Sequence, residues 1–435
     1  MINQTSASVV SWPETEHLET TDSSAQHLTD TSENAHAWQA GTDTDTANEQ
    51  DATGSTVFCN REGKALRVLF VVDSQFPRLG GAENQALKMA CALRERSVEV
   101  EFVAPRIRKS DPLTDSVMGF KLVRIDYPHI KWVGSIALMA KLYRYLIRHA
   151  NRFDAVHVHI THIMAAAAGY ARRRSSLPVI TKISGFYEFE GGVLDQNARY
   201  KPLNYLVRSG LRKVDFVQTI SEQTREKLLT AGFTPEQIKF VPNGIDTRIP
   251  PADMPADGPL TVGYCGRLRE VKGVHVLLDA FAIVKSSLPD ASIQLAIAGS
   301  GDTQQALEEQ ARRLGIENDI KWLGMVDDTE AFYRSVHIYV QPSFAEGLPN
   351  SVMEAMLARR PVIASEIGGN TDLVKHGDSG LLFKAGDANA LALRLTELIS
   401  NPEAGKALSQ AGHDLIVERY GFESVTRQLA DLYRA

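Results

Sequence analysis

Cysteine is scarce in this sequence, and long apolar runs are absent. The 435 residues include three cysteines, Cys59, Cys91 and Cys265, which share no metal-binding or disulfide spacing. Such usage fits a reducing compartment and excludes a disulfide scaffold. The longest apolar stretches have the length of a strand or are interrupted by charge, and the N-terminus shows no basic, apolar, small-residue signal pattern. We therefore expect a cytoplasmic protein without a membrane span.

The first 63 residues also lack a periodic apolar pattern. They hold one Lys or Arg against 11 Asp and Glu, a net charge of −10. Composition of this kind predicts a disordered acidic tail over residues 1–63. The net charge is +12 over residues 64–250 (29 basic against 17 acidic) and −8 over residues 251–435 (17 against 25).

Strand-like and helix-like segments alternate after the tail, which predicts parallel sheets covered by helices. The strand pattern at residues 65–72 is followed by Gly80 and Gly81, a loop able to approach a phosphate, and then by a helix pattern. The Pro- and Asp-rich residues 251–258 predict a linker between two domains, residues 64–250 and 259–415.

The stretch YVQPSFAEGLPNSVMEAML predicts a strand, a loop and a helix that begins near Ser351 with Asn350 as its N-cap. A helix that begins there directs unpaired N–H groups, with those of Gly347 and Leu348, toward a phosphate or a sugar. Its interpretation as an ordinary strand-loop-helix unit remains open.

Two carboxylates, Glu346 and Glu354, flank this predicted anion site at a spacing of eight residues. Each is able to accept hydrogen bonds from sugar hydroxyls, although Glu354 also suits the dipole of its own helix. A second loop holds the cations Arg267 and Lys272, whose donors match phosphate oxygens; a solvated basic loop is the alternative.

Several motifs resemble the GT4-type retaining glycosyltransferases of group 1. They are the E-x7-E spacing, QPSFAEGLP, GYCGRLREVKGVHVLLDAF, LAIAGSGD, KWLGMV and FVPNGIDTR, and the resemblance spans roughly residues 65 to 430. It implies an α/β protein of GT-B architecture, with two Rossmann-like domains facing across a cleft. The first domain would bind the acceptor and the second the nucleotide sugar, while residues 416–435 would form a terminal helix that crosses back to the first.

The resemblance also implies roles for individual residues. Glu346, Arg267 and Lys272 would act on the reacting sugar and its diphosphate, and Glu354 would bind the ribose. The other implied donor-binding residues are Gly347, Leu348, Asn350, Gly299, Gly301, Met325, Val326, Gly80 and Gly81.

The acceptor side departs from the family pattern, because Ser184-Gly185 stands where many members have His-Gly. Ser184, Glu188 and Lys182 are substitutes that the sequence does not rank, and His159 is expected to line the site. The histidines nearby have no adjacent Cys or carboxylate partner, so we expect no metal.

The resemblance implies a metal-independent retaining glycosyltransferase without a cofactor. Its partners would be a UDP- or GDP-type donor and a saccharide or polyprenyl-linked acceptor of cell-surface or exopolysaccharide synthesis, and no nucleic acid. A nucleotide-sugar epimerase and a non-catalytic nucleotide-sugar-binding protein are the alternatives.

A basic helix pattern around residues 136–150 suggests attachment to an anionic membrane at the inner face of the plasma membrane. The alternative is that its apolar stripe packs on the sheet. The positions concerned are Lys131, Lys141, Arg144, Arg148 and Arg152, with the apolar Trp132, Leu138, Met139, Leu142, Tyr143, Leu146 and Ile147.

Overall fold

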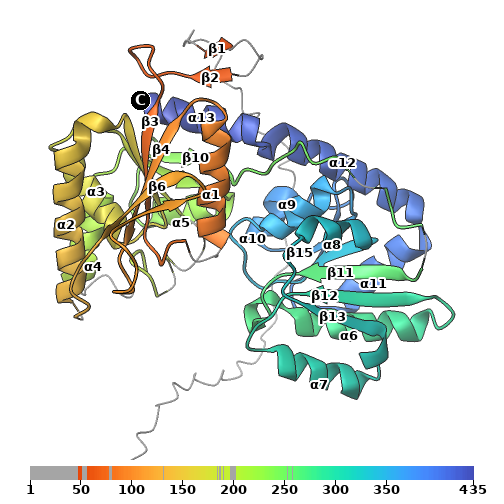
Figure 1. Ribbon diagram of the computed structural model, residues 1–435. Coiled ribbons are helices and arrows are strands. Elements are labelled where there is room, and N and C mark those ends of the chain that lie inside the picture. The colour runs from red at the N-terminus through yellow and green to blue at the C-terminus, as the bar shows by residue number, and fades with distance from the viewer. Residues whose placement is uncertain are drawn as a thin grey trace, which may run out of the picture. The chain divides into compact units, whose positions relative to one another are not determined.

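The computed structural model describes residues 48–50, 56–77, 81–130, 132–183, 185, 188–189, 191–195, 202–251, 253–256 and 258–435. Two predominantly parallel sheets with helices packed on both faces make up the fold (Figure 1). This arrangement confirms the predicted α/β class with two Rossmann-like domains.

The first sheet has eight strands in the order β10-β9-β8-β7-β3-β4-β6-β5, and its neighbours are parallel except at β5. Its central strands are continuous apolar runs because both faces are covered. In β3, for example, Val68 to Val72 are all buried. The strands are β3 (Arg67–Val72), β4 (Glu99–Pro105), β5 (Thr114–Val117), β6 (Phe120–Ile125), β7 (Ala155–His159), β8 (Val179–Lys182), β9 (Phe216–Thr219) and β10 (Ile238–Phe240).

The helices of the first domain form two layers, one on each face of this sheet. One core cluster joins the sheet to α2, α3, α4 and α5, and another joins it to α1 and to the last helix of the chain. The bounds are α1 (Gly81–Arg94), α2 (Val133–His149), α3 (Ile163–Arg172), α4 (Pro202–Leu211) and α5 (Glu222–Thr230).

The second sheet has six parallel strands in the order β13-β12-β11-β14-β15-β16. Because β11 and β14 are central neighbours, the loops that follow them meet at the carboxyl edge of the sheet, where such sheets bind ligands. The strands are β11 (Leu260–Cys265), β12 (Ile293–Ala298), β13 (Ile320–Gly324), β14 (Ile338–Gln341), β15 (Val362–Ser365) and β16 (Leu381–Phe383); the helices are α6 (Val274–Ser287), α7 (Gln304–Leu314), α8 (Thr329–Ser335), α9 (Asn350–Leu357), α10 (Gly368–Leu373) and α11 (Ala388–Ser400).

The chain returns to the first domain at its C-terminal end. Helix α12 (Pro402–Tyr420) packs against α9, and α13 (Phe422–Arg434) packs against α1, as the blue ribbons of Figure 1 show. Val425, Leu429 and Tyr433 are buried in the same core cluster as Phe70 of β3, and the Tyr433 hydroxyl lies 2.8 Å from Nδ1 of His157. The core of the first domain therefore includes the last residues of the chain.

The acidic tail ends earlier than the sequence indicates. Strand β2 (Thr56–Phe58) pairs with β1 (Asn48–Gln50), and Phe58 is 1% exposed in the core of the first domain. The predicted boundary at residue 63 is wrong because one apolar side chain anchors a segment of otherwise polar composition. The tail residues before position 48 lie outside the described residues.

Candidate functional site

Helix α9 begins beside the carboxyl edge of the second sheet. Pro349, whose backbone is extended (φ −75°, ψ 114°), takes the N-cap position, so the prediction of Asn350 as N-cap is wrong. A fixed proline φ suits the residue just before a helix. The N–H groups of Gly347, Leu348 and Ser351 have no acceptor among the described residues. Unpaired amides at a helix start form an anion-binding arrangement.

Glu346 and Lys272 are in direct contact at this edge. The Nζ of Lys272 lies 2.6 Å from Oε1 of Glu346, and their side chains are 23% and 10% exposed. The same Oε1 also accepts hydrogen bonds from Gln341 Nε2 and Ser343 Oγ, at 2.7 Å each. The structure thus brings together two residues that the sequence placed in one site, and it adds two residues that the sequence did not single out.

A glycine explains how the two loops meet. Gly273 has φ +65°, and a Cβ built there would lie 2.1 Å from the carbonyl oxygen of Pro342. Any other residue would therefore push apart the loops that hold Lys272 and Glu346. Arg267 lies in the same loop but is exposed, and its guanidinium has no partner in the part of the chain that the structure describes. The two predicted cations thus differ, since one is already paired and the other is unengaged.

Gly299 and Gly301 hold two loops of the site together. Added Cβ atoms would lie 1.8 Å from the Gly266 carbonyl oxygen and 1.9 Å from that of Leu268. Packing between the loops after β11 and β12 is therefore sufficient to require these glycines, whatever contact they make with a ligand.

Of the residues predicted to meet the base, Met325 is 76% exposed and Val326 is half-buried.

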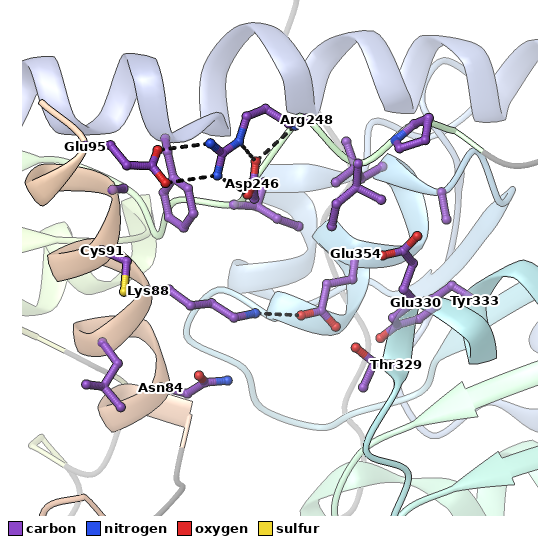
Figure 2. Close-up of a pocket in the computed structure, with 18 of the residues that line it drawn as sticks. Asn84, Lys88, Cys91, Glu95, Asp246, Arg248, Thr329, Glu330, Tyr333 and Glu354 are labelled. Atoms are coloured by element: carbon purple, nitrogen blue, oxygen red, sulfur yellow. Dashed lines mark hydrogen bonds and ion pairs between the residues drawn. The ribbon is translucent and has the colours of Figure 1, made fainter. Parts of the chain in front are cut away.

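Glu354 faces the first domain. Its Oε1 lies 3.5 Å from Nζ of Lys88 on α1, and Figure 2 shows the two side chains directed toward one another. They border a cavity of about 460 Å³ between α1, α8, α9 and residues 245–250. The Arg248 guanidinium, paired with Glu95 and Asp246, also lines it (Figure 2). Sequence reasoning missed Lys88, because nothing in the sequence links α1 to α9.

Asn350 connects helix α9 to the first domain. Its Oδ1 accepts hydrogen bonds from Gln85 Nε2 at 3.0 Å and from Asn243 Nδ2 at 3.1 Å. Asn243 in turn accepts from Nζ of Lys182 at 2.7 Å, and burial lowers the pKa of this lysine to about 8. A buried polar chain thus runs from β8 to the start of α9. No sequence pattern reveals it, since its members are far apart in the chain.

The residues predicted to lie on the acceptor side have different outcomes from those of the donor side. His159 is 2% exposed and packs against Phe70 and His157, and burial lowers its pKa well below the usual value. The prediction that it lines the site is wrong, because the strand turns its ring into the core. Glu188 is buried and engaged, Gly81 begins α1, and Ser184 and Gly80 lie outside the described residues.

His162, which follows β7 of the first sheet, is more accessible than His159. Its side chain is 47% exposed, Nδ1 lies 3.7 Å from Oδ2 of Asp73, and the proximity of this carboxylate raises its pKa. Within the described ranges, no group of three or more His, Cys, Asp or Glu side chains is arranged to hold a metal ion.

The helix proposed for membrane contact presents a different face from the predicted one. Leu138, Met139, Leu142 and Leu146 of α2 are buried in the core of the first domain, so the prediction that they are available to a membrane is wrong. The exposed apolar residues cluster at the start of the helix instead: Ile130, Trp132, Val133 and Ile136. No described helix is long and apolar enough to cross a bilayer.

Two Rossmann-like domains, joined by a linker and by a returning terminal helix, define a protein of the GT-B class. A family model described as "Glycosyl transferases group 1" matches residues 247–414, and one described as "Glycosyltransferase Family 4" matches residues 79–249. Together they cover well over half of the chain, which therefore belongs to the family 4 glycosyltransferases.

Individual proteins agree with this assignment. The phosphatidyl-myo-inositol mannosyltransferase of Mycobacterium leprae is 27% identical over 395 residues, covering 85% of this chain and 96% of that protein. The lipopolysaccharide core biosynthesis glycosyltransferase LpsE of Rhizobium meliloti is 29% identical over 174 residues, 40% of this chain and 49% of that protein. This chain matches several further relatives over less than half of their length. The crystal structure of Anabaena Alr3699/HepE in complex with UDP superposes with a TM-score of 0.68 at 21% identity, covering 84% of this chain and 99% of the other.

Proposed function

We propose that this chain transfers a sugar from a nucleoside diphosphate donor to a hydroxyl acceptor, with retention of configuration and without a metal ion. The main supporting observation is the Lys272–Glu346 pair, which lies at the edge of the second sheet. Beside it are amides and an arginine, Arg267, that have no partner within the described part of the chain. A carboxylate for sugar hydroxyls and cations for a diphosphate are thus adjacent.

In the proposed reaction, the acceptor oxygen bonds to the anomeric carbon on the face from which the diphosphate leaves. The bond from that carbon to the phosphate oxygen breaks, and the proton of the acceptor passes to the leaving phosphate. Charge develops on the diphosphate, which Arg267, Lys272 and the amides of Gly347 and Leu348 are suited to stabilise. Lysine has three ammonium protons, so Lys272 can hold Glu346 and a phosphate oxygen together.

The donor is proposed to be a UDP- or GDP-sugar. HepE was crystallised with UDP and with UDP-glucose, which supports a nucleotide sugar for this fold. Glu354 would accept hydrogen bonds from the ribose hydroxyls. Lys88, which is paired with Glu354, would change its side-chain position when the ribose binds. Backbone near Met325 and Val326 would meet the base.

The acceptor is proposed to be a saccharide or a lipid-linked saccharide of cell-surface polysaccharide synthesis. The relatives that act in lipopolysaccharide core synthesis and on phosphatidyl-myo-inositol support an acceptor of this kind. The net charge of +12 in the first domain and the exposed apolar residues at the start of α2 support attachment to the inner face of the plasma membrane.

The function is tested by incubating the purified protein with a panel of UDP-, GDP- and ADP-sugars and measuring nucleotide release with and without lipid-linked saccharides. We expect release from one donor, increased by an acceptor and yielding a glycosylated product. Conversion of the donor to its epimer without an acceptor would indicate the epimerase instead. Tight donor binding without turnover would indicate a nucleotide-sugar-binding protein.

The membrane proposal is tested by vesicle sedimentation with anionic liposomes. We expect binding that weakens with salt and is lost when Lys141, Arg144 and Arg148 on α2 are changed to Glu. A matched control changes three exposed basic residues of the second domain, Arg312, Arg313 and Lys321, to Glu. Equal loss in both variants would mean nonspecific attraction, and no binding at low salt would exclude the membrane.

A further inference from the structure

Gln341 is buried at the end of β14 and is in contact with Glu346. Its side chain is completely hydrogen-bonded: Nε2 donates to Glu346 and to Ser343, and Oε1 accepts from the hydroxyls of Tyr339 at 2.7 Å and Ser351 at 3.0 Å. An ionised carboxylate only accepts, so the amide nitrogen must face Glu346. The orientation of the Gln341 amide is therefore fixed by partners on both sides.

These contacts make the two oxygens of Glu346 unequal. Oε1 receives Lys272, Gln341 and Ser343, whereas Oε2 has no partner among the described residues. Lys272 alone would not hold the carboxylate in one orientation, because an ammonium on a flexible stem follows its partner. The buried amide and hydroxyl are more rigid, and a carboxylate bonded by three donors through one oxygen keeps the other free.

We propose that Gln341, assisted by Ser343, is a positioning residue that holds Glu346 so that Oε2 alone is offered to a hydroxyl of the donor sugar. The inference rests on the proposed function, since it assigns Glu346 to the sugar. Both polar atoms of the Gln341 side chain are already engaged by protein groups, so its loss should affect the transfer step and leave the diphosphate contacts intact. A glutamate that rotates freely would spend less time in the productive orientation.

The test compares Gln341→Leu with a matched control, Gln294→Leu. Gln294 lies on the nearby strand β12 and makes its own hydrogen bond, to Thr261 Oγ1, away from Glu346. The probes are the panel nucleotide sugar that the wild type turns over fastest and its nucleoside diphosphate. For Gln341→Leu we expect kcat to fall roughly 10- to 100-fold, with affinity for the nucleoside diphosphate within about twofold of wild type. The control should change neither quantity by more than about twofold.

A double-variant cycle separates positioning from general damage. In a Glu346→Ala background, Gln341→Leu should have no further effect on kcat, because the residue through which it acts is gone. A similar fall in both backgrounds, or a parallel loss of nucleoside diphosphate affinity, would overturn the proposal. If Gln341→Leu fails to fold, Ser343→Ala replaces it, with a smaller fall in kcat expected and the same cycle applied; no fall would overturn the proposal.

The same experiment distinguishes failure of the proposed function from failure of the positioning role of Gln341. If the wild type turns over no nucleotide sugar of the panel, the proposed function fails, and the role of Gln341 fails with it. If the wild type is active and Gln341→Leu behaves like Gln294→Leu, only the positioning role is refuted.

Discussion

The contrast between Arg267 and Lys272 gives the most specific prediction. Both are proposed to bind the donor diphosphate, but only Lys272 is already paired, at 2.6 Å from Glu346 with side chains 23% and 10% exposed. Changing Lys272 to Ala removes one of three donors to a nearly buried carboxylate, which we expect to cost about 1–3 kcal/mol of stability. Arg267 is exposed and has no partner among the described residues, so Arg267→Ala should change stability by less than about 0.5 kcal/mol.

Ligand affinity should respond differently from stability. Each substitution removes a charge-assisted contact to phosphate worth about 1.5–3 kcal/mol, which corresponds to roughly 10- to 150-fold weaker binding of UDP. Uridine lacks the diphosphate, so its affinity should be unchanged in both variants.

Titration calorimetry with UDP and uridine, together with thermal unfolding, measures the UDP affinity, the uridine affinity and the stability of each variant. GDP and guanosine replace these ligands if the donor proves to be a GDP-sugar. A loss of stability only in Lys272→Ala, with a loss of nucleoside diphosphate affinity in both, is expected. Equal losses for the nucleoside and its diphosphate would refute the proposed phosphate contacts, and equal stability losses would refute the argument from pairing.

The remaining predictions concern Glu354, Asp372 and the metal. Glu354→Gln should weaken donor binding by about 1.5–3 kcal/mol, which calorimetry measures. Lys88→Met breaks a partly exposed ion pair and should cost under about 1 kcal/mol of stability, which thermal unfolding measures. An unchanged donor affinity in Glu354→Gln would remove the proposed role of Glu354. Burial raises the pKa of Asp372 to about 6, so folding favours its protonated form and stability should fall as pH rises from about 4 through 6. Asp372→Asn should abolish this dependence and gain about 1–2 kcal/mol at pH 7, after allowance for partial exposure; an unchanged pH profile of unfolding would contradict it. Activity should survive excess EDTA, and loss with rescue by a divalent cation would contradict the metal-free reaction.

The fold was predictable because its signals are local. Continuous apolar strands, glycine-bearing turns and alternating helices recur along the chain, and they specify parallel sheets without reference to distant residues. The placement of Glu346 and Lys272 in one site was also predictable, since the loops after strands β11 and β14 meet at one sheet edge. Their direct contact was not, because it depends on the close approach that Gly273 permits.

Features that depend on tertiary packing were missed or misread. Asn350 looked like an N-cap because its type and position favour one, yet its side chain bonds to Gln85 and Asn243 of the first domain. His159 looked like a site residue because it ends a strand, but alternation along β7 turns its ring into the core. Phe58 lies in a polar segment, and only the structure shows that it is buried.

The anomeric configuration of the product tests the central claim most directly. Proton NMR during turnover of an α-linked nucleotide sugar from the panel, in the presence of EDTA, reports the linkage as it forms. The proposed same-face reaction predicts an α-linked product at wild-type level and little product from Glu346→Ala. A β-linked product, or transfer that does not depend on Glu346, would contradict the account.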